Sequence, residues 1–153
     1  FVYENREILL GILEDNIGNS FRKEGEFVLK KEERYREYWQ VLDQWLKYEL
    51  KGNSIAQYLM EKSYTSVAIY GLGMLGTSLV MDLERGGIEV KYGIDQDIYK
   101  GRQFGFPVYT LENELPEVQI IIVTTTGIFN SISEKLHNRS NAKIISLRSI
   151  LGI

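Results

Sequence analysis

The chain of 153 residues contains no cysteine, only two prolines and a single histidine, His137. The absence of cysteine excludes disulfide bonds, thiolate catalysis and cysteine–zinc sites. One histidine supplies too few nitrogen ligands for a transition-metal site, so we expect no bound metal. No apolar run approaches the ~20 residues that a membrane-spanning helix requires, and no secretory signal opens the chain. We therefore expect a cytoplasmic protein without a membrane span.

An excess of charge of one sign is also missing, because the formal net charge is -3. A chain this weakly acidic has no basic surface that would predict binding to nucleic acid or to an anionic membrane. Hydrophobic residues make up 44% of the chain and charged residues 25%, as is typical of globular domains. The length suffices for a small domain with an appendage. Because residue 1 is Phe rather than Met, we expect a fragment of a longer product or a chain without its natural start.

Residues 1–62 form the first of two predicted regions, and their apolar residues recur at helical spacing. One helix is expected over 8–17 and a longer one over 31–50. The longer helix carries a stripe at nearly heptad spacing, formed by Tyr35, Tyr38 with Trp39, Leu42, Trp45 with Leu46, and Glu49 with Leu50. Glu49 interrupts its apolar character. This stripe either packs on the rest of the chain or pairs with a second copy, and we favour a homodimer. Gly52 ends the helix, and a capping-box sequence at 54–57 begins a short third helix that ends near residue 62.

From Thr65 onward, segments typical of strands and of helices alternate. Strands are expected at 66–70, 89–94, 107–109, 118–124 and 143–147, and helices at 74–86, 111–115 and 128–138. Strands joined by helices favour a parallel sheet that is covered on both faces. We therefore predict an α/β, Rossmann-like domain over 63–153, with five parallel strands in the order 3-2-1-4-5.

A glycine motif, G-x-G-x-x-G, follows the first predicted strand and opens the next helix at Gly71, Gly73 and Gly76. In a nucleotide-binding βαβ unit the first glycine permits a tight turn and the second lets a pyrophosphate approach the main chain. The third lets the helix pack close to the strand. Backbone amides at the start of the helix, at Met74 and Leu75, can donate to the anion. The alternative is that the glycines only shape a turn and that nothing binds.

An acidic residue, Asp95, ends the second predicted strand. A carboxylate at this point of a βαβ unit can accept hydrogen bonds from a ribose. Its charge would repel a 2′-phosphate, so we expect NAD rather than NADP. Equally open is the reading that Asp95 is an ordinary polar residue in a solvated turn with Gln96 and Asp97.

Three threonines, Thr124, Thr125 and Thr126, end the fourth predicted strand, which lies next to the first strand in the predicted order. Ligands of open α/β sheets bind at this topological switch point. The hydroxyls could hold a phosphate or a sugar hydroxyl, or Thr125 or Thr126 could simply cap the next helix. The predicted cofactor-binding residues are therefore Gly71, Gly73, Met74, Leu75, Gly76, Asp95, Thr124, Thr125 and Thr126.

No catalytic residue is predicted. Tyr58 and Lys62 form a Y-x-x-x-K pair of the kind that transfers protons in short-chain dehydrogenases. The pair precedes the glycine motif, however, and should lie at the opposite end of the strands from a bound nucleotide. The chain offers no other convergence of acid, base and nucleophile.

Several short stretches, taken together, carry a family resemblance. They are the glycine motif at 69–76, Tyr92 to Asp95, Lys100-Gly101, 105–109 with its sequence GFPVY, Leu115-Pro116, the apolar strand at 118–123 and 144–147. With these features, residues 66–147 resemble the small Rossmann domains of bacterial sugar-nucleotide and surface-polysaccharide proteins, often described as CoA-binding-like. Some members look to bind NAD(P), others a UDP-sugar, and others no known ligand. The enzyme-defining motif of the related dehydratases is absent.

These observations lead us to expect a nucleotide-binding module for NAD or, alternatively, for a UDP-sugar or CoA. We expect it to be non-catalytic on its own and linked with polysaccharide biosynthesis through the resemblance alone. Two alternatives stay open. The chain could be a fragment of an NAD-dependent oxidoreductase or sugar-nucleotide dehydratase that lacks its catalytic part, or a dimeric interaction protein with a vestigial pocket. Whether the chain is an enzyme is left open.

Overall fold

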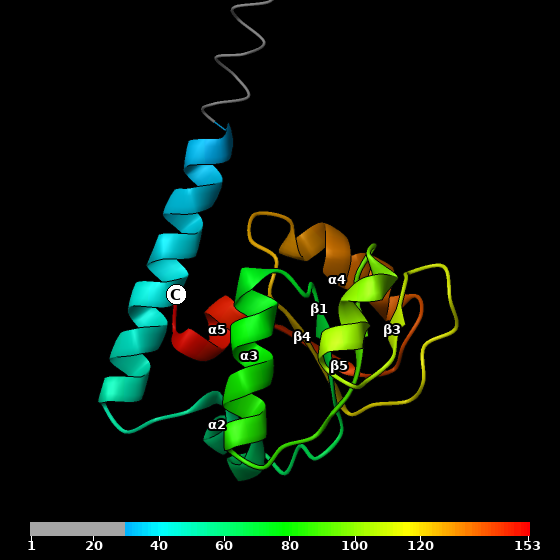
Figure 1. The fold of residues 1–153 in the computed structure, drawn as a ribbon, viewed down its shortest axis with the longest axis horizontal. Helices are drawn as coiled ribbons and strands as arrows, with labels where there is room; N and C mark the ends of the chain where they lie inside the picture. Colours follow the sequence, from blue (N-terminus) through cyan, green and yellow to red (C-terminus); the bar gives the residue numbers. More distant parts are fainter. Residues whose placement is uncertain (1–29) are drawn as a thin grey trace, which may run out of the picture. The chain divides into compact units, whose positions relative to one another are not determined.

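The computed structural model describes residues 30–153. The chain divides into two compact units, residues 1–37 and residues 38–153. Within the first unit, residues 30–37 are helical. The second unit begins with helical residues 38–50 and then holds the sheet with its helices (Figure 1). The helix predicted over 8–17 lies outside the described residues.

The second unit is a parallel α/β fold. In chain order its elements are α2 (Ile55–Glu61), β1 (Val67–Tyr70), α3 (Met74–Arg85), β2 (Val90–Ile94), the 3-10 helix η1 (Ile98–Gln103), β3 (Val108–Tyr109), β4 (Ile120–Val123), α4 (Phe129–His137), β5 (Lys143–Ser146) and α5 (Leu147–Leu151). All four strand pairings are parallel, and the strand order is β3-β2-β1-β4-β5. The predicted class and strand order are confirmed.

Both faces of the sheet are buried, because successive side chains of a strand point to opposite faces. Ile69 and Ile122 belong to a core shared with α2, α3 and α5, whereas Ala68 and Ile121 belong to a second core beneath α4. Figure 1 shows α3 and α4 on opposite sides of the strands. A strand buried on both faces must be apolar throughout, which explains the sequence of β4.

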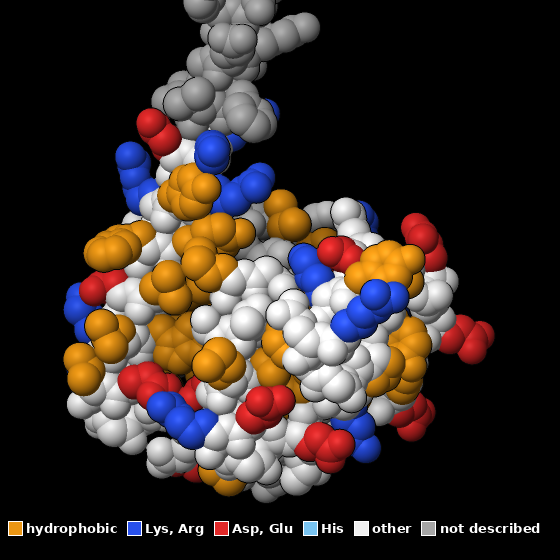
Figure 2. Space-filling model, in the orientation of Figure 1, with side chains coloured by type: hydrophobic (Ala, Val, Ile, Leu, Met, Phe, Trp, Pro, Cys, Tyr) orange, Lys and Arg blue, Asp and Glu red, His pale blue; other side chains and the backbone are white. Residues whose placement is uncertain are grey.

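Helical residues 38–50 take part in the first of these cores. Val41 and Trp45 are buried there with Ile55 and Leu59, and Tyr38 and Leu42 pack at its edge. Part of the predicted stripe therefore packs within the chain itself, which is one of the two readings left open. Three other residues of the predicted stripe, Trp39, Leu46 and Leu50, are exposed. Hydrophobic side chains gather on this surface in Figure 2, and the homodimer stays a prediction.

The predicted boundary between the long helix and α2 is confirmed by its hydrogen bonds. Gly52 has φ +83°, a conformation that favours glycine at a helix C-terminus. The Ser54 hydroxyl accepts a hydrogen bond from the Gln57 N–H at 3.0 Å, as a capping residue does. From α3, the buried Asp82 carboxylate accepts the Ile55 N–H at 3.0 Å. These bonds satisfy amides that the first turn of α2 leaves without helical partners.

The helix predicted over 111–115 is wrong, because the chain forms a turn there. The Thr110 N–H donates to the Asn113 side-chain oxygen at 2.8 Å, and the Asn113 N–H donates to the Thr110 carbonyl oxygen at 3.2 Å. Asparagine side chains compete in this way with the helical hydrogen bonds of the backbone. Pro116 follows shortly afterwards and limits any helix that could form before it.

Two short helices were not predicted. The last strand ends at Ser146 rather than at residue 147, and α5 begins at once. The Ser146 hydroxyl accepts the Ser149 N–H at 3.1 Å and so caps α5. The other is η1, which follows β2 and is capped by Asp97. Both helices are too short to show a helical period in the sequence.

Candidate functional site

The glycine motif forms the turn between β1 and α3. Gly71 has φ +89°, and its N–H donates to the Ile94 carbonyl oxygen at 2.9 Å. A Cβ added at Gly76 would collide with the Gly71 carbonyl oxygen, so the helix and the turn can approach each other only because residue 76 lacks a side chain. The conformational roles predicted for Gly71 and Gly76 are confirmed.

Gly73 lies at the N-cap position of α3 and is exposed. Apart from Gly73 and its two neighbours in the chain, no atom lies within 4 Å of the position that its Cβ would occupy, so the main chain here is accessible. Because the N-cap residue is a glycine, it has no side chain that could accept a hydrogen bond from the first turn. The N–H groups of Met74 and Leu75 have no partner within the helix by virtue of helix geometry. They are therefore available to an anion.

Asp95 follows β2 directly and points at the glycine turn. One carboxylate oxygen accepts the Leu72 N–H at 2.8 Å, and the other accepts the Asp97 N–H at 2.9 Å. The Lys100 ammonium lies 3.1 Å from both oxygens. Burial by itself raises the pKa of Asp95, but the two backbone hydrogen bonds and Lys100 outweigh burial and lower it. Asp95 is therefore a carboxylate held in its ionised form by the chain's own donors.

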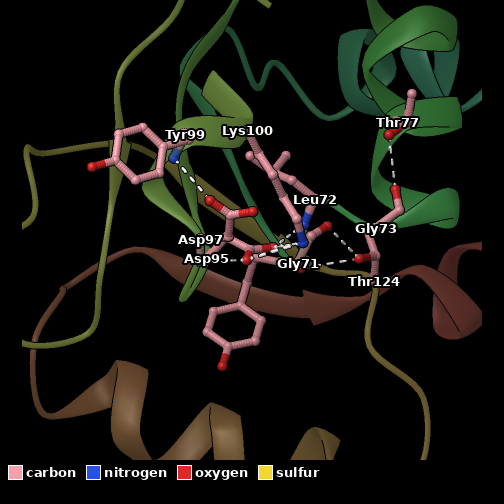
Figure 3. A network of polar contacts seen from close by, with 10 residues as sticks. Gly71, Leu72, Gly73, Thr77, Asp95, Asp97, Tyr99, Lys100 and Thr124 are labelled. Atoms are coloured by element: carbon pink, nitrogen blue, oxygen red, sulfur yellow. Dashed lines mark hydrogen bonds and ion pairs between the residues drawn. The ribbon is translucent and has the colours of Figure 1, made fainter. Parts of the chain in front are cut away.

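Lys100 is the residue of this site that sequence reasoning missed as a functional candidate. Figure 3 shows its side chain reaching from η1 to Asp95, beside the glycine turn. The side chain of Asp95 is 12% exposed and that of Lys100 is 32% exposed. The sequence does place a lysine five residues after Asp95. This spacing predicts an ion pair only if the intervening chain folds back towards Asp95, as η1 does.

Thr124, at the end of β4, forms hydrogen bonds with the glycine turn. Its hydroxyl lies 2.7 Å from the Gly71 carbonyl oxygen and 3.1 Å from that of Tyr70, and the residue is buried. A hydroxyl has one proton to donate, and here that proton is used within the chain. Thr124 therefore joins β4 to the glycine turn at the predicted switch point.

Thr125 differs from Thr124, because its buried hydroxyl oxygen has no hydrogen-bond partner among the described residues. Neither Thr125 nor Thr126 caps the following helix, so that alternative is wrong. Gly127, with φ +75°, turns the chain, and Ile128 becomes the N-cap of α4 without a side-chain hydrogen bond. Two residues, Gly127 and Ile128, therefore separate the threonines from the first residue of α4. The N-terminus of α4 is consequently as uncapped as that of α3.

A cavity of about 640 Å³ opens beside Asp95 at the carboxyl ends of β1, β2 and β3. Tyr70, Ile94 and Leu111 form apolar parts of its wall, and the polar and charged parts come from Gln96, Thr110, Glu112, Lys135, Asn138 and Arg139. Burial, together with the nearby Asp95 charge, raises the pKa of Tyr70. Its phenol is therefore neutral near pH 7, and the cavity can take a partly apolar ligand with polar edges.

Across residues 30–153, no three His, Asp or Glu side chains are grouped so that they could hold a metal ion. The helices of this same part include none that is long and apolar enough to cross a bilayer. A comparison of the sequence with models of known families and with curated proteins gave no match.

Proposed function

We propose that this chain binds a nucleotide and holds its diphosphate at the carboxyl ends of β1 and β4. The observation that carries the proposal is a pair of uncapped helix N-termini. α3 follows β1, α4 follows β4, and neither helix is capped by the side chain of its N-cap residue. Because β1 and β4 are neighbours in the sheet, both helices begin at the switch point.

The three shorter helices of the second unit differ from this pair at their N-termini. α2, η1 and α5 are each capped by a side chain, from Ser54, Asp97 and Ser146 respectively. Unpaired amides at two helix ends, with their positive dipoles, favour a ligand that carries two adjacent negative groups. The unpartnered Thr125 hydroxyl lies on the loop between β4 and α4 and adds a further group that could serve a ligand.

The nucleoside portion would extend from the glycine turn past Asp95 into the cavity beside it. The apolar side chains of Ile94 and Leu111 suit the face of a base, and Gln96 and Thr110 can bond to its edge. NAD, a UDP-sugar and CoA all contain a nucleoside joined to a diphosphate. The link with polysaccharide biosynthesis rests on the sequence resemblance, and no catalytic group is proposed.

A second candidate, the dimeric interaction protein, is favoured by a different observation. Trp39, Leu46 and Leu50 are 72%, 59% and 77% exposed on one helix. Exposed apolar residues that lie together often mark a protein interface. This role does not require the nucleotide site and can coexist with it.

Titration calorimetry with ADP, NAD, UDP-glucose and CoA tests the main proposal. At least one of these compounds should bind, and Gly73→Val should weaken that binding at least tenfold, because a branched side chain would occupy the approach to the amides. The space around Gly73 is open, so circular dichroism should show an unchanged fold. Met81→Val, an exposed change near the other end of α3, is the matched control and should bind normally. Absence of binding by all four compounds would contradict the proposal.

A further inference from the structure

The acceptor capacity of Asp95 is already filled within the chain. A carboxylate offers about four acceptor positions. Two are used by the Leu72 and Asp97 amides, and the bridging Lys100 ammonium uses the other two. A ribose diol that donated to Asp95, as in NAD recognition, would have to displace one of these donors.

Lys100, by contrast, keeps donor capacity. An ammonium has three N–H donors, and Asp95 uses two of them. About a third of the side chain is exposed. Beside the glycine turn, the side chain that keeps a free donor is therefore a cation, next to a carboxylate whose charge it offsets. The repulsion that a free Asp95 would exert on a phosphate is correspondingly reduced.

The fold holds Lys100 in this position from two sides. Asp97 caps η1 by accepting the Tyr99 N–H at 3.1 Å. The next residue after the lysine, Gly101, is buried, and a Cβ there would come within 2.8 Å of the Val108 side chain on β3. Because η1 packs so closely on β3, Lys100 is positioned by the fold as well as by its partner.

The cavity beside Asp95 adds further positive charge. Lys135 and Arg139, from the end of α4, line its wall, and the only carboxylates in that lining are Asp95 and Glu112. With the charge of Asp95 offset by Lys100, the two cations of this lining, Lys135 and Arg139, face one remaining carboxylate, Glu112. Such a field attracts an additional anionic group on the nucleoside.

We infer that the nucleotide of this chain carries a phosphate on its ribose, and that Lys100 binds that phosphate. The inference rests on the proposed function and narrows its ligand class. A ribose phosphomonoester has two common sources, the 2′-phosphate of NADP and the 3′-phosphate of CoA. The sequence, with Asp95 taken as a free acid, favoured NAD over NADP. The pairing with Lys100 reverses that preference.

Two matched pairs of ligands test the inference by calorimetry: NADP against NAD, and CoA against 3′-dephospho-CoA. Members of a pair differ by one ribose phosphate. In at least one pair the phosphorylated member should bind about tenfold more tightly, the scale of one charge-assisted hydrogen bond. The pair that shows the difference identifies the position of the phosphate.

Lys100→Gln should remove this advantage and, because it frees the oxygens of Asp95, should improve binding of the member without the phosphate. Lys100→Arg should retain the advantage. Lys91→Gln makes the same chemical change at an exposed position of β2 and should leave both ratios unchanged. Equal or tighter binding of the unphosphorylated member in both pairs would overturn the inference and leave nucleotide binding intact. If no nucleotide binds at all, the proposed function and the inference both fail.

Discussion

Asp95 gives the site a pH-dependent contribution to stability. The pKa of Asp95 is lower in the folded chain than its ordinary value of 3.8. A carboxyl group whose pKa is lowered by folding stabilises the fold above its unfolded pKa. That stabilisation is lost as the pH falls through the ordinary value towards the lower folded pKa.

The free energy of unfolding should therefore decrease as the pH falls below about 5, since unfolded aspartate titrates near pH 4. Asp95→Asn keeps one acceptor oxygen and loses the charge. It should lower stability at pH 7 by about 1–2 kcal/mol and flatten the dependence on pH. Urea unfolding of both proteins at several pH values measures this. Parallel curves for the two proteins would show that Asp95 is not the responsible group.

At the scale of single residues, the sequence predicted the roles that depend on main-chain geometry. It missed the contacts that side chains make with other parts of the folded chain. The roles of Gly71 and Gly76 follow from geometry that any βαβ turn imposes, so the motif was sufficient. The use of the Thr124 hydroxyl and of Lys100 within the site depends on residues brought together by folding. The sequence alone does not show that η1 folds Lys100 back onto Asp95, or that the Thr124 hydroxyl meets the Gly71 carbonyl oxygen.

Among the elements, α3 shows how stability and binding can oppose each other. Gly73 has extended backbone angles, φ −75° and ψ −156°, at the N-cap position. Gly73→Asp would supply the capping acceptor and a negative charge near the helix dipole. It should raise the free energy of unfolding by a few tenths of a kcal/mol and abolish nucleotide binding, because the new carboxylate would occupy and repel the anion site.

For this variant, denaturant unfolding measures the free energy of unfolding, and calorimetry on the same preparation measures nucleotide binding. Gly73→Asn is the matched control, since it also caps the helix but adds no charge. It should bind nucleotide weakly rather than not at all. A Gly73→Asp protein that binds nucleotide as well as the original chain would rule out α3 as the anion site.

The elements that the sequence predicted correctly are those with a strong period or a specific end signal. The apolar run of β4, the glycine turn before α3 and the serine cap of α2 are of this kind. The helix predicted at 111–115 failed because Asn113 turns the chain locally. Helices η1 and α5 span only about one to two turns, and they depend on caps and on packing against β3 and the first core.

At the scale of the whole molecule, the compact unit that holds the sheet also includes helical residues 38–50 and α2. The compact unit begins at Tyr38, and residues 38–62 bury Val41, Trp45, Ile55 and Leu59 in the core of the sheet. The sequence predicted a division at residues 62 and 63 from the change in composition. Composition cannot show which side chains of a charged helix are buried.

Two truncations test the extent of the folding unit. A protein of residues 38–153 should retain a cooperative thermal transition. A protein of residues 63–153 should lose it, because burial of four large core side chains, each contributing on the order of 1.5–3 kcal/mol, would be missing. Circular dichroism during heating measures both. Cooperative unfolding of 63–153 at an unchanged midpoint would show that residues 38–62 are not needed by the sheet.

The homodimer is a separate prediction about the whole chain. Trp45 is unsuitable for testing it, because the residue is 6% exposed and its loss would disturb the core. Leu46→Lys and Leu50→Lys alter exposed positions of the same helix instead. Light scattering should give the mass of a dimer for the original chain and of a monomer for the double variant. A monomer in both cases would end the prediction.

The central claim is that a diphosphate binds to main-chain amides at the starts of α3 and α4. Amide NMR spectra recorded while ADP is added test it most directly, because each N–H reports its own surroundings. The account predicts the largest shifts at residues 73–76 and 129–131, and their loss in Gly73→Val. Shifts that are confined to other surfaces, or absent at millimolar ADP, would contradict it.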